Sequence, residues 1–132
     1  EKDLFLCGDA IQLQQILNNL IRNAIDAVRN LPRERRIIRV DVASDLQRIQ
    51  IQVTDRGCGV DVQDRTKLFQ PFYTTKSDGL GLGLAISRSL AEAHQGSLTY
   101  RQAEPFGAQF TLELPRFTSD YALPRPPQVE NA

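Results

Sequence analysis

Hydrophobic residues along the chain follow two different spacings, one typical of helices and the other typical of strands. Apolar residues recur every three or four positions from about Ala10 to Asn30 and again from about Leu82 to His94, which predicts two amphipathic helices. Asp9 is placed to cap the start of the first helix, and Pro32 follows its end. Gly96 is placed to close the second helix.

Apolar and polar residues alternate in most of the remaining chain, which is the pattern of strands with one buried face. The predicted strands are residues 36–44 and 48–55, which form a hairpin, and two strands within 96–115, which turn around 104–107. A short apolar run, "LFLC" at 4–7, is expected to form a further strand before the first helix. Residues 56–83 are irregular and contain glycines, with room for a short helix at about 64–68.

This order of elements predicts an α+β fold in two layers. About three helices are expected to cover one face of a mixed, mostly antiparallel sheet. The 132 residues suffice for one domain that buries most of the surface its unfolded chain exposes. That domain is expected at residues 1–115, and the proline-containing residues 116–132 are expected to form a flexible tail.

Charge and cysteine content narrow the function classes. Lysine and arginine total 16, as do aspartate and glutamate, so no overall field favours nucleic acid or an acidic membrane surface. No apolar run approaches the roughly 20 residues of a membrane span, and no signal-peptide pattern opens the chain. Cys7 and Cys58 lack metal-ligand spacing, which fits a reducing compartment. The sequence is therefore expected to be a soluble, cytoplasmic fragment that does not bind nucleic acid.

Polar side chains form a stripe along the first predicted helix, beside its core face. The core face consists of Leu13, Ile16, Leu17, Leu20, Ala24 and Val28, and the stripe consists of Gln12, Asn19, Asn23, Asp26 and Asn30. Amides are ordinary at a helix boundary, but asparagine is only a middling helix former. A pair spaced i and i+4 places two neutral oxygens on one side of the helix, where they suit a hydrated Mg²⁺.

Two glycine-containing segments carry further candidate chemistry. In "DRGCGV", Asp55 ends a predicted strand, and Gly57 and Gly59 frame a turn that is common where a chain leaves a strand. The alternative is that its carboxylate accepts a hydrogen bond from an exocyclic amine such as that of adenine, while Gly57 and Gly59 let a flat base approach the backbone. In "DGLGLGLAIS", glycines alternate with leucines just before the second helix, whose N-terminus suits an anion. These glycines are Gly79, Gly81 and Gly83.

Four segments occur in a characteristic order, and together they resemble the conserved boxes of a known family. "NNLIRNAIDA", "DRGCGV", "LFQPFYTTK" and "GLGLGLAIS" resemble the N box, first glycine box, F box and second glycine box of the sensor histidine kinase catalytic domain. That family belongs to the GHKL superfamily, with DNA gyrase, the mismatch-repair ATPases and the heat-shock chaperone ATPases. The resemblance covers about Gly8 to Leu114 and implies the Bergerat fold, with ATP and Mg²⁺ as ligands.

The resemblance also implies roles for individual residues. Asp55 would read the adenine amino group, Asn23 would hold Mg²⁺, and Asn19 would contact the phosphates or the metal shell. Phe69 and Phe72 match the F box and would shape the lid over the nucleotide. The expected nucleotide-binding residues are Asn19, Asn23, Asp26, Asp55, Gly57, Gly59, Thr75, Lys76, Gly79, Leu80, Gly81, Leu82, Gly83 and Leu84, with Asn19 and Asn23 catalytic and Asn23 the metal ligand.

The lid implied by the resemblance runs from about Tyr73 to Gly83. It is shorter than in many relatives, and nucleotide is expected to order it through contacts between backbone amides and phosphates. The leucines at 80, 82 and 84 would hold it to the core. Lys76 within it is either a phosphate ligand or a solvated lysine.

The branch of the superfamily determines the reaction. Hydrolysing members carry a glutamate four residues before the magnesium asparagine, and here that position is Asn19, whose amide cannot act as a general base. The resemblance therefore implies transfer of the γ-phosphate to a histidine on an upstream dimerisation domain. A response regulator receiver domain is the expected second partner. The isolated module is expected to be a monomer and the full-length protein a homodimer, which is either cytoplasmic throughout or anchored in a membrane with this module on the cytoplasmic side. An ATP-sensing module without transfer activity and a GHKL ATPase remain the alternative functions.

The chain contains one histidine, and it is not the expected phosphate acceptor. His94 lies near the end of the second predicted helix, about 15 Å from its start. A histidine at that end of a helix is expected to act as a cap or a dipole partner. The acceptor histidine is therefore expected on the separate dimerisation domain.

Overall fold

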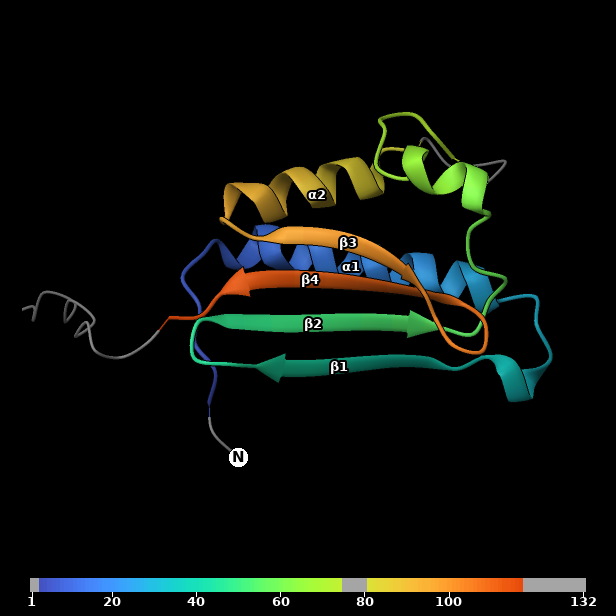
Figure 1. Ribbon diagram of the computed structural model, residues 1–132, viewed down its shortest axis with the longest axis horizontal. Helices are drawn as coiled ribbons and strands as arrows, with labels where there is room; N and C mark the ends of the chain where they lie inside the picture. Colours follow the sequence, from blue (N-terminus) through green and yellow to red (C-terminus); the bar gives the residue numbers. More distant parts are fainter. Residues whose placement is uncertain (1–2, 75–80, 118–132) are drawn as a thin grey trace, which may run out of the picture.

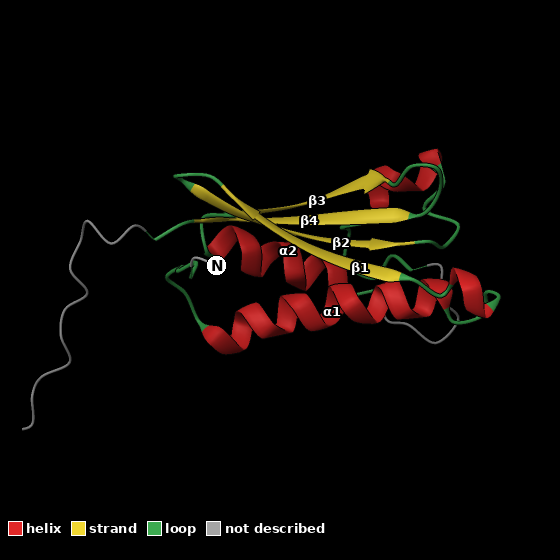
Figure 2. Cartoon of the chain, turned by 90° about the horizontal axis from the view of Figure 1, so that it is seen from below, coloured by secondary structure: helices red, strands yellow, loops and turns green. Residues whose placement is uncertain are grey.

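The computed structural model describes residues 3–74 and 81–117, which form one sheet covered by helices (Figure 1). The elements are α1 (Ala10–Val28), η1 (Arg33–Arg35), β1 (Ile38–Ser44), β2 (Arg48–Asp55), η2 (Val62–Lys67), α2 (Gly83–Ala93), β3 (Ser97–Gln102) and β4 (Ala108–Pro115), where η1 and η2 are 3₁₀ turns. Figure 2 shows the sheet as one layer and the two α-helices as the other. The expected two-layer α+β fold is therefore confirmed.

The four strands form one sheet in the order β1-β2-β4-β3. Each neighbouring pair is antiparallel. The register places Val53 of β2 between Val40 of β1 and Phe110 of β4. Because side chains alternate along a strand, this register turns Val53 and Phe110 together toward the helices. The expected hairpin and the turn before β4 are both present.

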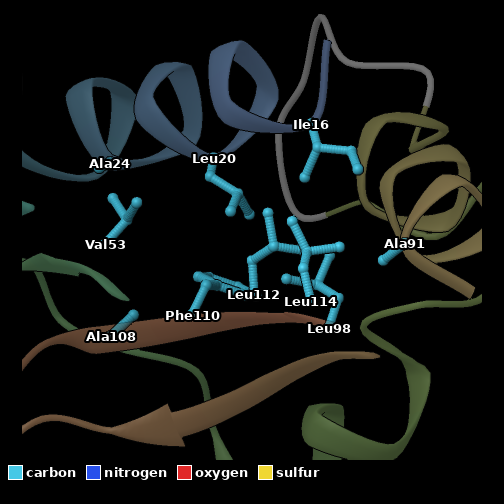
Figure 3. Close-up of a cluster of buried hydrophobic side chains, with 10 residues drawn as sticks. All are labelled: Ile16, Leu20, Ala24, Val53, Ala91, Leu98, Ala108, Phe110, Leu112 and Leu114. Carbon is cyan, nitrogen blue, oxygen red and sulfur yellow. The ribbon is translucent and has the colours of Figure 1, made fainter. Parts of the chain in front are cut away.

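The core lies between the sheet and the helices (Figure 3). Its buried members are Ile16, Leu20, Ala24, Val53, Ala91, Leu98, Ala108, Phe110, Leu112 and Leu114. On α1, the buried residues recur every fourth position, and Leu13 and Leu17 pack beside them as predicted. Burying one large aliphatic side chain of this kind contributes about 1.5–3 kcal/mol, so this face fixes α1 on the sheet.

Two expectations at the ends of the chain were wrong in detail. The run at 4–7 forms no strand; Leu6 packs against the core instead, and the Phe5 carbonyl accepts a hydrogen bond from the Phe117 amide at 2.8 Å. The predicted tail begins at Arg116, but the Arg116 amide donates to the Gln47 carbonyl at 2.8 Å. Residues 116 and 117 are thus held to the body of the domain by backbone hydrogen bonds.

The end of α2 is tied to the start of α1 through His94. The imidazole Nδ1 lies 2.8 Å from the Leu90 carbonyl, and Nε2 accepts a hydrogen bond from the Asp9 amide at 3.0 Å. His94 is therefore a cap, as predicted. The left-handed conformation that closes the helix belongs to Gln95, with φ 57°, rather than to Gly96. Gly96 is required because a Cβ there would collide with the Glu113 carbonyl.

Candidate functional site

The polar stripe of α1 meets the start of α2 at Asn19. This half-buried side chain donates from Nδ2 to the Gly83 carbonyl at 3.3 Å and to the Ser87 hydroxyl at 3.0 Å. An amide nitrogen carries two hydrogens, so both have a protein acceptor here. The oxygen Oδ1 is the atom of this amide that remains suited to accept a hydrogen bond or bind a cation.

Asn23 and Asp26 follow Asn19 along the same stripe. Asn23 is one turn further on, about 6 Å along the helix axis, and is half-buried like Asn19. Asp26 forms an ion pair with Arg29 at 2.8 Å. The structure therefore gives Asp26 a local partner, whereas its role toward a nucleotide stays a prediction.

Asp55 lies at the end of β2 and is buried, with 4% of its surface exposed. Its Oδ1 accepts hydrogen bonds from the Gly57 amide at 2.8 Å and from the Ala108 amide at 3.4 Å. Burial raises the pKa of this carboxyl above its usual range, and the two backbone hydrogen bonds oppose that shift. The carboxylate is thus fixed in direction by the backbone while one of its oxygens, Oδ2, remains for another donor.

The turn after Asp55 packs directly against α1. A Cβ at Gly57 would lie 2.9 Å from the Ala27 carbonyl oxygen and 3.0 Å from the Ala27 Cβ, so glycine lets this loop touch the helix. Ala27 is eight residues beyond Asn19, which corresponds to about 12 Å along α1. The helix α1 therefore sets the spacing between the Asp55 turn and the start of α2.

The second glycine of the same turn has a conformational reason. Gly59 has φ 72°, and a Cβ there would lie 3.0 Å from the Gly107 carbonyl oxygen. The Val60 amide beside it donates to the Tyr100 hydroxyl at 3.1 Å. Packing within the protein thus explains both Gly57 and Gly59, and their contact with a flat base remains a prediction.

Within residues 3–74 and 81–117, no side chain caps the start of α2. Leu82 occupies the N-cap position and makes no side-chain hydrogen bond to the first turn. Among the same residues, outside the glycine's own turn of helix, the atom nearest to a Cβ at Gly83 would be the Asn19 Cγ at 3.8 Å, so the described part of the chain leaves room at this glycine. The first amides of a helix lack intrahelical partners and attract anions. This end of α2 is therefore suited to phosphate, and Leu84 packs against the core one residue further on.

The base of the expected lid is closed by a backbone hydrogen bond. The Phe72 amide donates to the Gly81 carbonyl at 3.0 Å. Gly81 has φ 71°, and a Cβ there would lie 2.5 Å from the Tyr73 carbonyl oxygen, so the protein itself requires this glycine. A hydrogen bond to Asp64 raises the pKa of the Tyr73 hydroxyl. Thr75, Lys76, Gly79 and Leu80 lie outside the described residues.

The two F-box phenylalanines differ in environment. Phe69 packs edge-on against Phe110 of the core, with ring centroids 6.3 Å apart, and the Arg88 guanidinium lies 5.1 Å above its ring. Phe72 is 73% exposed and has φ 66°, a conformation rare for a residue with a side chain. Phe69 thus anchors the segment before the lid, and Phe72 lies at the base of the lid.

The donor atoms of this region fit a magnesium ion held mainly by a nucleotide. Within residues 3–74 and 81–117, no group of three or more His, Cys, Asp or Glu side chains is placed to hold a metal. Mg²⁺ prefers oxygen ligands and usually binds through one or two side chains together with substrate phosphates and waters. Asn19, which is bonded to the start of α2, has an amide oxygen of that kind, and Asn23 lies one turn further along α1.

Sequence reasoning missed Ser87 and the Ala108 amide. Ser87 looks like an ordinary small residue in a helix, and its partner Asn19 is 68 positions away. The Ala108 amide donates to Asp55, which is 53 positions away. Because the donor is a backbone group, the residue type at position 108 does not reveal this contact. A signal for Ser87 was present, because a hydroxyl on the inner face of an amphipathic helix needs a hydrogen-bonding partner.

Comparison with known proteins agrees with this geometry. Residues 8–118 match the family described as "Histidine kinase-, DNA gyrase B-, and HSP90-like ATPase". The sequence is 38% identical to the sensor protein TdiS of Thauera aromatica over 107 residues, which is 80% of this chain and 20% of TdiS. The chain therefore spans about a fifth of that relative's length.

Two solved structures resemble the fold. The mycobacterial sensor histidine kinase MprB aligns with TM-score 0.70 and 28% identity, over 84% of this chain and 76% of the other. Full-length ShkA in complex with AMPPNP aligns with TM-score 0.71 and 28% identity, over 88% of this chain and 24% of the other. Neither α-helix in the described part of this chain is long and apolar enough to cross a membrane.

Proposed function

The chain belongs to the family of histidine kinase-, DNA gyrase B- and HSP90-like ATPases, and on that premise we propose that it binds Mg²⁺ and ATP and donates the γ-phosphate to a histidine on a separate dimerisation domain. It would thus be the catalytic module of a cytoplasmic kinase in two-component signalling. TdiS and MprB are themselves named as a sensor protein and a sensor histidine kinase, which supports this branch of the family.

The observation that carries the proposal is the way α1 joins the two ends of the site. At one end, Gly57 packs against Ala27 of α1, and its amide donates a hydrogen bond to the Asp55 carboxylate. At the other end, Asn19 bonds to Gly83, the first residue of α2, and no side chain of the described residues caps the amides of that helix. The turn of Asp55 and the start of α2 therefore contact one helix at points about 12 Å apart along its axis, which would place a carboxylate for the base and helix amides for the phosphates in one site.

Asp55 would select adenine. Its Oδ1 is held by two backbone amides, and Oδ2 would accept a hydrogen bond from the exocyclic amine of adenine. Guanine presents a carbonyl at the same position, so two acceptors would face each other. Unpaired buried polar groups of this kind cost about 1–3 kcal/mol, which would weaken GTP binding by roughly 5- to 150-fold relative to ATP.

The reaction would be transfer to histidine rather than to water. Asn19 occupies the position of the general base in hydrolysing relatives, and its amide nitrogen is bonded to the Gly83 carbonyl and the Ser87 hydroxyl. It cannot remove a proton from water near neutral pH. In the transfer, the bond between the γ-phosphorus and the β–γ bridging oxygen breaks, and a bond from phosphorus to an imidazole nitrogen forms.

The protein's part in this transfer would be positioning. Phosphoryl transfer needs alignment and charge stabilisation more than covalent chemistry from the enzyme. The amides at the start of α2 would hold the phosphates, and Asn23 and Asn19 would hold Mg²⁺ against them. The bound magnesium would neutralise charge on the β- and γ-phosphates.

The partners follow from the same proposal. The chain covers 20% of TdiS and 24% of ShkA, so relatives of this kind carry further domains. An upstream dimerisation domain would bring the acceptor histidine, and a response regulator receiver domain would take the phosphate from it. The full-length protein would then be a homodimer, although this module alone would be a monomer.

The proposal is tested by nucleotide binding and by transfer. Calorimetry with Mg²⁺ should show ATP and ADP binding and GTP binding weaker by at least about fivefold. Asp55→Asn should keep the two backbone hydrogen bonds but lose about 2 kcal/mol of ATP binding, or roughly thirtyfold in affinity, because an amide cannot provide a second carboxylate oxygen. Equal affinity for ATP and GTP would contradict the assignment of Asp55.

A matched control is available at the opposite end of the sheet. The Asp45 Oδ1 also accepts two backbone amides, from Gln47 at 2.7 Å and Arg48 at 2.8 Å, but it lies in an exposed turn. Asp45→Asn should leave nucleotide affinity unchanged.

A transfer experiment distinguishes a kinase from an ATP sensor. The chain is mixed with dimerisation domains of sensor kinases and γ-labelled ATP. Label on a histidine supports the kinase, whereas ATP binding without label on any of them supports an ATP sensor.

A further inference from the structure

We infer that Ser87 is a positioning residue, which orients the side-chain amide of Asn19 so that its oxygen faces the nucleotide and its metal. This inference rests on the proposed function, because it assigns Asn19 to the phosphate end of that site. Ser87 itself is buried one turn into α2 and does not contact the ligand in this assignment. Its role would be exerted only through Asn19.

The burial of Ser87 is the first observation. Its exposed fraction is 0%, and in residues 3–74 and 81–117 the only other buried polar or charged side chain is Asp55. The neighbouring residue on the same face of α2, Ala91, belongs to the apolar core. A hydroxyl in such a place is unfavourable unless it is hydrogen-bonded. The hydroxyl of Ser87 has that bond, from Nδ2 of Asn19 at 3.0 Å.

The geometry of the amide is the second observation. Asn19 could in principle place either Nδ2 or Oδ1 toward α2, because the two ends of an amide have nearly the same shape. The Gly83 carbonyl, 3.3 Å from Nδ2, accepts hydrogen bonds only, so a flipped amide would set two acceptors against each other. Ser87 provides the acceptor for the second hydrogen of the same nitrogen. Together the two acceptors fix which end of the amide points away from α2.

This arrangement has a consequence for the ligand. With Nδ2 bonded to α2, Oδ1 is the atom of the Asn19 amide that remains for a ligand, and it lies 4.0 Å from where a Cβ on Gly83 would be. An oxygen there suits a cation or its water shell, whereas an amide nitrogen would repel it. Loss of Ser87 would leave one hydrogen of Nδ2 without an acceptor and allow the amide to rotate. The effect should appear at the phosphate and metal end and spare the base end at Asp55.

The test uses the full 132-residue chain and three ligands: adenosine, ADP without Mg²⁺, and ADP with Mg²⁺. Ser87→Ala should reduce the gain in ADP affinity that Mg²⁺ provides by about tenfold, the effect of one lost hydrogen bond to a buried group. Adenosine affinity should stay within about twofold of wild type. Ser87→Thr, which keeps the hydroxyl, should restore part of the magnesium effect. Ser89→Ala, exposed and two residues along α2, is the matched control and should change nothing.

A double-mutant cycle separates positioning from general packing. If Ser87 acts through Asn19, Ser87→Ala should have no further effect on the magnesium-dependent gain once Asn19→Ala is present. Equal loss for adenosine and for ADP with Mg²⁺, or additive effects of the two substitutions, would overturn the inference. Should Ser87→Ala fail to fold, Ser87→Thr and Ser87→Cys provide the same comparison, since sulfur is a weaker acceptor than oxygen. Absence of ADP binding in the wild-type chain would instead contradict the proposed function.

Discussion

The two α-helices begin in opposite ways. At the start of α1, the Asp9 Oδ1 accepts hydrogen bonds from the amides of Ile11 at 2.9 Å and Gln12 at 3.0 Å. The Asp9 carbonyl accepts from Leu13, and the Asp9 amide donates to His94. At the start of α2, Leu82 offers no side-chain cap.

The difference shows which helix end serves stability and which serves binding. Every helix begins with amides that need an acceptor from outside its own backbone. At α1, the Asp9 carboxylate accepts hydrogen bonds from these amides, and its negative charge is stabilised by the positive end of the helix dipole. At α2, Leu82 occupies the same position, and its side chain has no atom that can accept a hydrogen bond. Gly83 follows, and no described residue would crowd a Cβ there. The second start therefore suits an anionic ligand, and three substitutions test whether this contrast is real.

The largest effect is expected from giving α2 the cap that α1 has. Leu82→Asp would place a carboxylate where the phosphates are proposed to bind, occupying the amides and repelling the ligand. We expect a loss of about 2 kcal/mol in ATP binding, or roughly thirtyfold in affinity, measured by calorimetry with Mg²⁺. Leu82→Ala is the control for loss of the leucine side chain and should lose much less. Unchanged ATP affinity in Leu82→Asp would show that these amides do not bind phosphate.

A smaller effect of a different kind is expected at α1. Asp9→Ala removes its cap and should lower the free energy of unfolding by about 1 kcal/mol, read from urea denaturation. ATP affinity should not change, because this cap lies at the opposite end of α1 from Asp55. Asp9→Asn keeps an acceptor oxygen and should recover most of the stability. A drop in ATP affinity that matched the drop in stability would remove the contrast between the two helix starts.

The smallest effect on folding is expected at Gly83. Among the described residues outside its own turn of helix, the nearest atom to its added Cβ would be 3.8 Å away, so Gly83→Ala should raise the free energy of unfolding by about 0.5 kcal/mol. A fall in ATP affinity in this stable variant would then report close approach of phosphate to the backbone. Gly81→Ala is the comparison, because φ 71° and the Tyr73 contact make that substitution strained without any ligand. If Gly83→Ala binds ATP like wild type, the phosphates do not approach this glycine.

Periodicity made the helices and the hairpin predictable. The buried face of α1 has four members at every fourth position, Ile16, Leu20, Ala24 and Val28, and a pattern of that length has few alternatives. Apolar and polar residues alternate in the sequences of β1 and β2, over seven and eight residues, which was enough to predict the hairpin. The run at 4–7 has only four residues and no partner visible in sequence, and here apolar character did not produce a strand.

The purpose of each glycine was less predictable than its presence. The sequence groups Gly57, Gly81 and Gly83 as openings for a ligand. Gly57 is required by its contact with Ala27, and Gly81 by its contact with Tyr73, whereas no described residue would crowd a Cβ on Gly83. Whether a glycine is required by packing depends on which loops and helices come into contact, and these contacts cannot be read from a single sequence. The motif therefore located the site, but only the packing separates structural glycines from those available to a ligand.

The hydrogen bond between the Phe72 amide and the Gly81 carbonyl joins the two ends of the segment between these residues, so that segment can be exchanged for another. Its two ends are joined by the body of the domain, so the chain that connects them can change in length without shifting η2 or α2. Doubling the length of a flexible loop closed at its base costs only about 0.6 kcal/mol. Segments of different length from related proteins could therefore be exchanged at 75–80 without loss of folding, and the resulting change in ATP affinity would measure what Thr75, Lys76, Gly79 and Leu80 contribute to binding.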